Sequence, residues 1–123
     1  MQYRALLKAG YAAVNHAAYQ KRHVRARIRR RFIDPPDNNV KANLDLKINN
    51  TLEFLNIAAK RRGLESAVVR NICDLEYYMA EYSIRPPMHT KKLSRERKQI
   101  IDNCYDEYNL LIDMLNKQLD LLL

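Results

Sequence analysis

Residues 1–14 read MQYRALLKAGYAAV, and residues 25–32 read RARIRRRF. In the first stretch, large apolar side chains recur every three or four positions, which is the spacing of one face of an α-helix; they are Tyr3, Leu6, Leu7, Tyr11 and Val14. The second stretch is mostly arginine, and its apolar line is thin: Ala17, Val24, Ile28 and Phe32. We therefore predict two helices, over residues 2–15 and 17–33, of which the second is cationic around most of its circumference.

The same spacing continues along the rest of the chain. It predicts three more helices, over residues 40–62, residues 65–82 and from about residue 95 to residue 123. Pro35 and Pro36 should end the second helix. Helix caps are predicted at Asp37, Asn38 or Asn39 for the third helix and at Ser94 for the fifth, after a loop over residues 85–92.

The apolar lines of the later helices indicate one packed domain. The third helix carries Leu44, Ile48, Leu52, Leu55 and Ala59, the fourth Val68, Ile72, Leu75, Met79 and Tyr82, and the fifth an approximate heptad of Ile101, Cys104, Tyr108, Leu111, Leu115 and Leu122. The sequence has no strand signal and no internal repeat. We predict an all-α fold: a three-helix bundle over residues 1–63, with a helical extension over residues 64–123 packed on it.

The charge of the chain is concentrated at one end. The 123 residues carry a formal net charge of +8, and the first 33 of them hold nine Lys or Arg and no Asp or Glu. The remaining residues hold 13 basic and 14 acidic side chains, so they are close to neutral. A one-sided field of this kind indicates an anionic partner, which could be nucleic acid, anionic lipid or an acidic protein.

The residue patterns of common enzymes are missing. There is no HExxH, no GxSxG and no glycine-rich phosphate loop, and Asp102, Asp106 and Asp113 have no base or metal partner in the sequence. Cys73 and Cys104 are expected to be two buried thiols, because neither belongs to a CxxC pair. No apolar run approaches the ~18 residues of a membrane span. We expect a protein that is not an enzyme, binds no metal and does not cross a membrane.

The basic head, which is the acid-free stretch of residues 1–33, has three specific interpretations. A mitochondrial presequence is amphipathic, Arg-rich and free of acid, although here no Ser precedes Ser66 and the apolar stripe runs on into the domain. A nucleic-acid arm would neutralise several phosphates. A dock for an acidic protein or a phosphorylated cofactor suits arginine, whose planar fork pairs bidentately with carboxylate and phosphate. A merely solvated basic face is the simplest alternative.

Two motifs separate these interpretations. The opening Tyr3-Arg4-Ala5-Leu6-Leu7-Lys8, followed by Ile28-Arg29-Arg30-Arg31-Phe32, resembles the LYR family, small helical proteins of the mitochondrial matrix. The family pattern begins Leu-Tyr-Arg, and Gln2 stands here in place of that leucine. The stretch TLEFLNIAAKRRG (51–63) is similar to the subgroup of mitoribosome-assembly microproteins. The resemblance covers about residues 2–63, half of the chain.

The resemblance implies a non-enzymatic adaptor of the mitochondrial matrix that binds the mitochondrial acyl carrier protein. The cofactor would be 4′-phosphopantetheine with its acyl chain, supplied by that partner. The contacts with the carrier protein and phosphopantetheine would come from Tyr3, Arg4, Lys8, Arg25, Arg29 and Arg30. The acyl chain would lie in a channel lined by Leu7, Gly10, Tyr11, Ile28, Phe32, Leu52 and Leu55.

The subgroup further implies a role in assembly of the large mitoribosomal subunit, beside a silencing-factor-like protein and with ribosomal RNA as a secondary contact. Two alternatives stay open: an assembly factor or accessory subunit of a respiratory complex, including iron–sulfur delivery, and a basic helical RNA-binding protein with no acyl carrier partner. The stretches EYYMAEY (76–82) and NLLIDMLNKQLDLLL (109–123) are more apolar than a lone helix needs. We expect them to form a platform for a further protein.

Overall fold

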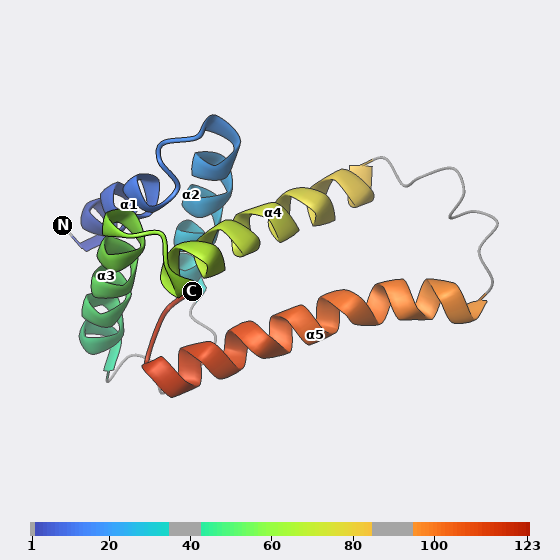
Figure 1. Ribbon diagram of the computed structural model, residues 1–123. Coiled ribbons are helices and arrows are strands. Elements are labelled where there is room, and N and C mark those ends of the chain that lie inside the picture. Colours follow the sequence, from blue (N-terminus) through green and yellow to red (C-terminus); the bar gives the residue numbers. More distant parts are fainter. Residues whose placement is uncertain (1, 35–42, 85–94) are drawn as a thin grey trace.

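The computed structural model describes residues 2–34, 43–84 and 95–123. These ranges hold five α-helices and no strand, which confirms the predicted all-α fold (Figure 1). The helices are α1 (Gln2–Ala13), α2 (Ala18–Ile33), α3 (Leu44–Lys60), α4 (Leu64–Ile84) and α5 (Arg95–Leu119). Several predicted features lie outside the described residues: the caps at Asp37, Asn38 or Asn39 and at Ser94, the helix-ending Pro35 and Pro36, the first turn of the third helix and the loop over residues 85–92. The side chains of Tyr82 and Ile101, predicted for the apolar lines of the fourth and fifth helices, also lie outside them.

Helices α1, α2 and α3 and the first turns of α4 gather into one bundle, and the outer parts of α4 and α5 project from it (Figure 1). Helix α1 packs chiefly against α3 and α2. Side chains from all four of these helices share one core cluster, which includes Leu6, Val24, Ile48, Leu55 and Val69. The bundle is therefore held together by long-range apolar burial.

Helix α1 buries its small residues. Its core-facing positions are Leu6, Ala9, Gly10 and Ala13. A Cβ atom placed on Gly10 would lie 2.6 Å from Cγ1 of Val24 and 3.3 Å from Cδ1 of Ile28. The backbone of α1 therefore lies directly against side chains of α2, which is possible because Gly10 has none. Of the predicted stripe, Leu6 and Val14 are buried, whereas Tyr3, Leu7 and Tyr11 are half-buried at the edge of this contact.

The turn between α1 and α2 makes the two helices antiparallel. Helix α1 ends at Ala13, two residues earlier than predicted, because Asn15 and His16 adopt left-handed backbone angles with φ of 52° and 57°. The His16 N–H donates to the Tyr11 carbonyl at 2.9 Å, which closes the helix with the bond of a Schellman motif. Asparagine tolerates this conformation better than most residues with a Cβ.

Helix α3 turns a slightly different face to the core than the predicted one. Its buried residues are Ile48, Thr51, Leu55 and Ala58. Leu52 is half-buried and Ala59 is exposed. The spacing of three and four is as predicted, but the buried line includes a threonine. Thr51 can be buried because its hydroxyl donates a hydrogen bond to the Lys47 carbonyl at 2.7 Å.

Helix α5 stops at Leu119, so the predicted continuation to residue 123 is wrong. Asp120 is left-handed, with φ of 50°, and the Leu121 N–H donates to the Asn116 carbonyl at 3.0 Å. The predicted heptad is also wrong in part. Leu111 is 64% exposed and Cys104 is exposed, whereas Ile112 is buried together with Tyr108 and Ile72. Helix α5 buries only some of its apolar residues, because only its last turns contact the bundle (Figure 1).

Candidate binding face and the cavity between the helices

The arginines of α2 are divided between two sides of the helix. Arg22, Arg25, Arg29 and Arg30 are exposed, whereas Arg27 and Arg31 are half-buried. Positions 27 and 31 are one helical turn apart, so they share the side of α2 that faces α4 and α5. The structure therefore assigns two roles to what is one basic run in the sequence.

The four exposed arginines line an open groove of about 490 Å³ along α2. Ala26 and Ile33 form its apolar floor, and Asp34 is the acidic residue at its end. None of these arginines forms an ion pair with any described residue. Their charges are therefore exposed to solvent and available to an anionic partner.

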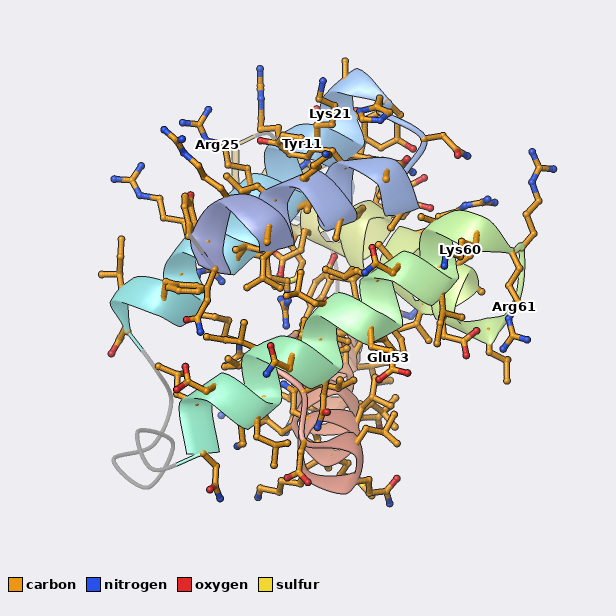
Figure 2. All side chains as sticks on the ribbon, turned by 90° about the vertical axis from the view of Figure 1, so that its left-hand side faces the viewer. Tyr11, Lys21, Arg25, Glu53, Lys60 and Arg61 are labelled. Carbon is orange, nitrogen blue, oxygen red and sulfur yellow. The ribbon has the colours of Figure 1, made fainter. Side chains whose placement is uncertain are left out.

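Helix α1 adds two cations beside this groove. Arg4 and Lys8 are exposed and recur at helical spacing with Tyr11, whose ring centre lies 5.3 Å from Nζ of Lys21 on α2. Figure 2 shows Tyr11, Lys21 and Arg25 together on the side formed by α1 and α2. We call this surface the basic face; its cations are Arg4, Lys8, Lys21, Arg22, Arg25, Arg29 and Arg30.

The basic face contains most of the predicted carrier-protein contacts. Arg25, Arg29 and Arg30 lie in one groove, and Arg4 and Lys8 lie on the neighbouring helix. Tyr3 is directed elsewhere: its ring packs edge-to-face on Phe32, with ring centres 5.4 Å apart and planes at 72°. Arg22 belongs to the groove although it is not among the predicted contacts, and its spacing of three and seven from Arg25 and Arg29 is the signal that places it there.

A small apolar cavity of about 40 Å³ lies between α2, α3 and α4. Of the seven residues of the predicted channel, only Ile28 and Leu55 line it. The space at Gly10 is filled by Val24. Leu7, Tyr11 and Leu52 are half-buried outside the cavity, and Phe32 is 37% exposed beside Tyr3. The rest of the lining comes from His23, Val24, Arg27, Thr51, Val69, Ile72, Cys73, Leu122 and Leu123.

Arg27 and Leu123 line this cavity, Arg31 is hydrogen-bonded to Leu123, and Tyr108 belongs to the same apolar cluster as Leu123. A guanidinium nitrogen of Arg27 donates to the Glu76 carboxylate, in an ion pair whose side chains are only 13% and 18% exposed. Nε of Arg31 donates to the Leu123 carbonyl at 2.8 Å. Nε of Arg27 and the Tyr108 hydroxyl are buried and have no hydrogen-bond partner among the described residues. Burial lowers the pKa of Arg31, with the nearby Arg27 adding to the effect, and burial raises the pKa of Tyr108.

The two cysteines differ in environment. Cys73 lines the cavity, its thiol donates to the Gln20 carbonyl at 3.8 Å, and burial raises its pKa to about 12. The prediction of a buried thiol is confirmed for Cys73 and wrong for Cys104, which is exposed. Both are free, and the thiol of Cys73 is protonated at neutral pH.

An exposed aromatic group adjoins the basic face. The ring of Tyr77 packs edge-to-face on Tyr19 at 5.8 Å and on Tyr78 at 5.6 Å. The Tyr19 hydroxyl donates to Asp74 at 3.2 Å, which fixes the ring. Tyr19 precedes Arg22 by three positions on α2, so the rings continue the line of the groove. The tyrosine pair at 77–78 is part of the predicted protein platform, but its contact with α2 has no signal in the sequence.

Across the parts of the chain that the structure describes, no three His, Cys, Asp or Glu side chains lie together as a metal site requires. In those same ranges, none of the helices combines the length and the apolar character needed to traverse a bilayer. Comparison of the chain with protein-family models, with curated proteins and with solved structures found no match in any of the three.

Proposed function

We propose that this chain is a non-enzymatic LYR-type adaptor that binds an acyl carrier protein through the basic face. The observation that carries the proposal is the gathering of seven cations from α1 and α2 on one surface, none of them in an ion pair with a described residue. An acidic helix of the carrier would complement this field, and the phosphate of its 4′-phosphopantetheine would suit the arginine forks.

The division of the α2 arginines supports the same function. Arg25, Arg29 and Arg30 face solvent and would meet the carrier, whereas Arg27 is held by Glu76 inside the protein. A partner can therefore neutralise the outward cations without removing a counter-ion from the fold. The acyl chain would enter the core beside Ile28, which touches both α1 and the apolar cavity.

We assign the adaptor to the mitochondrial matrix and to assembly of the large mitoribosomal subunit, as the resemblance to the LYR microproteins implies. The exposed apolar side chains of α5 support a further protein partner, such as a silencing-factor-like protein; they are Ile100, Leu110, Leu111 and Met114. A role in assembly of a respiratory complex is the alternative, and the proteins that co-purify with the tagged chain from mitochondria would distinguish the two.

The binding function is tested by titrating the full chain with acyl carrier protein in calorimetry. Arg29→Glu places an anion in the groove, and we expect the affinity to fall at least tenfold, which is about 1.4 kcal/mol. Arg62→Glu is the matched control, because it makes the same charge change at an exposed arginine outside α1 and α2. Absence of binding to the unsubstituted chain would overturn the proposal, and equal losses in both variants would overturn the assignment of the basic face.

RNA binding is a second candidate, favoured by the rings of Tyr19, Tyr77 and Tyr78 beside the arginine groove. Exposed aromatic rings next to cations are how many proteins hold single-stranded nucleic acid. If RNA is the partner, Tyr78→Ala should weaken RNA binding by about 1–3 kcal/mol. The same substitution should leave the affinity for acyl carrier protein unchanged, because Tyr78 lies outside the basic face.

A further inference from the structure

Three leucines enter the core from outside any helix. After Asp120 the chain turns back from the end of α5 toward the middle of the bundle (Figure 1). Leu121, Leu122 and Leu123 are then only 3%, 7% and 8% exposed. We call them the leucine segment. Its side chains belong to both apolar clusters that the described residues form, so it lies where the bundle meets the projecting helices α4 and α5.

Polar side chains from three helices hold the backbone of this segment. The Leu122 N–H donates to the Thr51 hydroxyl at 2.9 Å, and the Leu123 N–H donates to Oδ1 of Asn116 at 2.9 Å. The Leu123 carbonyl accepts from Nδ2 of Asn116 at 3.1 Å and from Nε of Arg31 at 2.8 Å. These bonds replace the helical ones that the segment lacks, and each can be removed by a single substitution.

The leucine segment forms one wall of the apolar cavity. Leu122 and Leu123 line it together with Ile28, Leu55 and Val69. At about 40 Å³ the cavity is too small for an acyl chain. If the segment moved out, the space that it vacates would join the cavity, because Leu122 and Leu123 line the cavity directly. Three extended residues span roughly 10 Å, so the joined space would be an apolar slot between α2, α3 and α4.

Three hydrogen-bond donors lie at the cavity or next to the leucine segment: Arg27 lines the cavity, Arg31 bonds to Leu123, and Tyr108 shares an apolar cluster with Leu123. Nε of Arg27 and the Tyr108 hydroxyl have no partner among the described residues, and departure of Leu123 would release Nε of Arg31 as well. Buried polar groups in native proteins are nearly always paired. Three donors around an apolar slot suit a ligand that is an apolar chain with carbonyl oxygens at one end.

We propose that the leucine segment is a displaceable plug in a channel between α2, α3 and α4, and that the acyl chain of a carrier protein takes its place. The inference rests on the proposed function and adds to it the position of the channel and the occupant that the acyl chain must displace. The carbonyl groups next to the acyl chain, in its thioester and the phosphopantetheine arm, would accept the hydrogen bonds of the donors at the edge.

The test compares carrier protein bearing a decanoyl chain with the holo form, whose phosphopantetheine ends in a thiol. The affinity of the full chain for each is measured by calorimetry, and exchange of the Leu122 and Leu123 amide protons is followed by NMR. We expect the decanoyl form to bind more tightly and to accelerate exchange of both amides at least tenfold over the holo complex. The holo form should leave the two amides protected.

Asn116→Ala removes two of the three side-chain bonds to Leu123 and leaves the one from Arg31. Asn109→Ala is the matched control, since Asn109 is an exposed asparagine on the same helix. The first variant should bind the decanoyl form at least threefold more tightly, with the holo affinity unchanged, and the control should alter neither. Thr51→Val should reproduce the effect by removing the bond to Leu122. A purely structural role of the segment predicts the reverse, with equal or weaker binding of the decanoyl form.

The outcomes separate this inference from the proposed function. Equal binding of the two carrier forms, or protected Leu122 and Leu123 amides in the decanoyl complex, would overturn the plug and leave the adaptor function standing. Failure of both carrier forms to bind would overturn the adaptor function and the plug with it.

Discussion

Substitution of Gly10 by alanine tests how closely α1 and α2 approach. In the middle of a helix, alanine is favoured over glycine by about 1 kcal/mol, so the local preference alone predicts a more stable protein. The structure predicts the opposite. The new Cβ would lie 2.6 Å from Cγ1 of Val24, whereas carbon atoms in contact lie about 3.5–4.0 Å apart. The two helices would have to separate by about 1 Å, since the β-branched Val24 has little rotameric freedom in a helix.

The expected magnitude follows from these two opposing effects. Overpacking of a close-packed core costs about 1–3 kcal/mol, and contact with stiff Val24 places Gly10→Ala at the upper end. After subtraction of the helix preference, the free energy of unfolding should fall by about 2 kcal/mol, which lowers the Tm of a chain of this size by about 8 °C. Urea and thermal unfolding followed by circular dichroism measure both quantities. Gly10→Ala combined with Val24→Ala should lose less than the sum of the two single changes.

Gly63→Ala is the matched control. Gly63 does not have a positive φ, and a Cβ atom there would meet only the flexible side chains of Glu65 at 3.3 Å and Arg61 at 3.5 Å. We expect its unfolding free energy to stay within about 0.5 kcal/mol of the parent. The reasoning is refuted if Gly10→Ala raises the Tm, because α1 and α2 then do not pack through the backbone of Gly10.

Three more predictions concern the polar groups of the core and the thiols. Glu76→Gln leaves Arg27 without its counter-ion and should lower the free energy of unfolding by about 3 kcal/mol in urea; an unchanged midpoint would mean that the pair is solvated. Thr51→Val leaves the buried Leu122 N–H unpaired and should cost about 1–3 kcal/mol in the same assay, against no loss if that N–H finds another acceptor. At pH 8 iodoacetamide should modify Cys104 alone, because the thiol of Cys73, with its pKa raised to about 12, stays protonated and buried; mass spectrometry showing modified Cys73 without denaturant would contradict this.

The all-α fold follows from apolar spacing, because that pattern persists whatever the helices pack against. The ends of the helices are harder to predict, since they depend on single residues in unusual conformations. Asn15 and Asp120 both adopt left-handed angles that glycine more commonly takes, and they end α1 and α5 earlier than the apolar pattern indicates. Gly63, the residue best suited to such a position after α3, does not adopt it.

Which face of each helix is buried depends on its partners and is only partly predictable. The predicted stripe of α1 is correct at Leu6 and Val14. Ala9, Gly10 and Ala13 are buried in place of Tyr3, Leu7 and Tyr11, because small residues permit a close approach to α2. In α5 the predicted heptad fails at Leu111, since most of the helix projects beyond the bundle and has nothing to pack on among the described residues. The spacing therefore predicts that each helix has a buried face, and tertiary contacts determine which residues form it.

The sequence predicts the positive charge of the basic head, but it does not predict which of its side chains form the exposed surface. Nine cations without an acid in 33 residues predict a cationic surface, and seven of them form one. The inward turn of Arg27 and Arg31 has no local signal, because it depends on Glu76 and Leu123, which come from other parts of the chain. The cavity is likewise built by α2, α3 and α4 together, so five of the seven residues of the predicted channel lie outside its lining.

Competition between the leucine segment and an acyl chain sets a quantitative relation between folding and binding. If both occupy the same slot, the apparent dissociation constant for the acyl chain is the intrinsic one divided by the fraction of molecules whose slot is open. When the acyl chain replaces the leucine segment, the apolar surface of the slot stays buried. The free-energy cost of displacing the segment therefore lies mainly in its hydrogen bonds to Thr51, Asn116 and Arg31. Substitution of Thr51 or Asn116 should therefore tighten acyl binding by the factor by which it raises the open fraction, whereas substitution of Arg31 would also remove a donor to the bound ligand. In a series of such variants, the logarithm of the affinity for the acyl chain should rise with the logarithm of the open fraction along one straight line of unit slope.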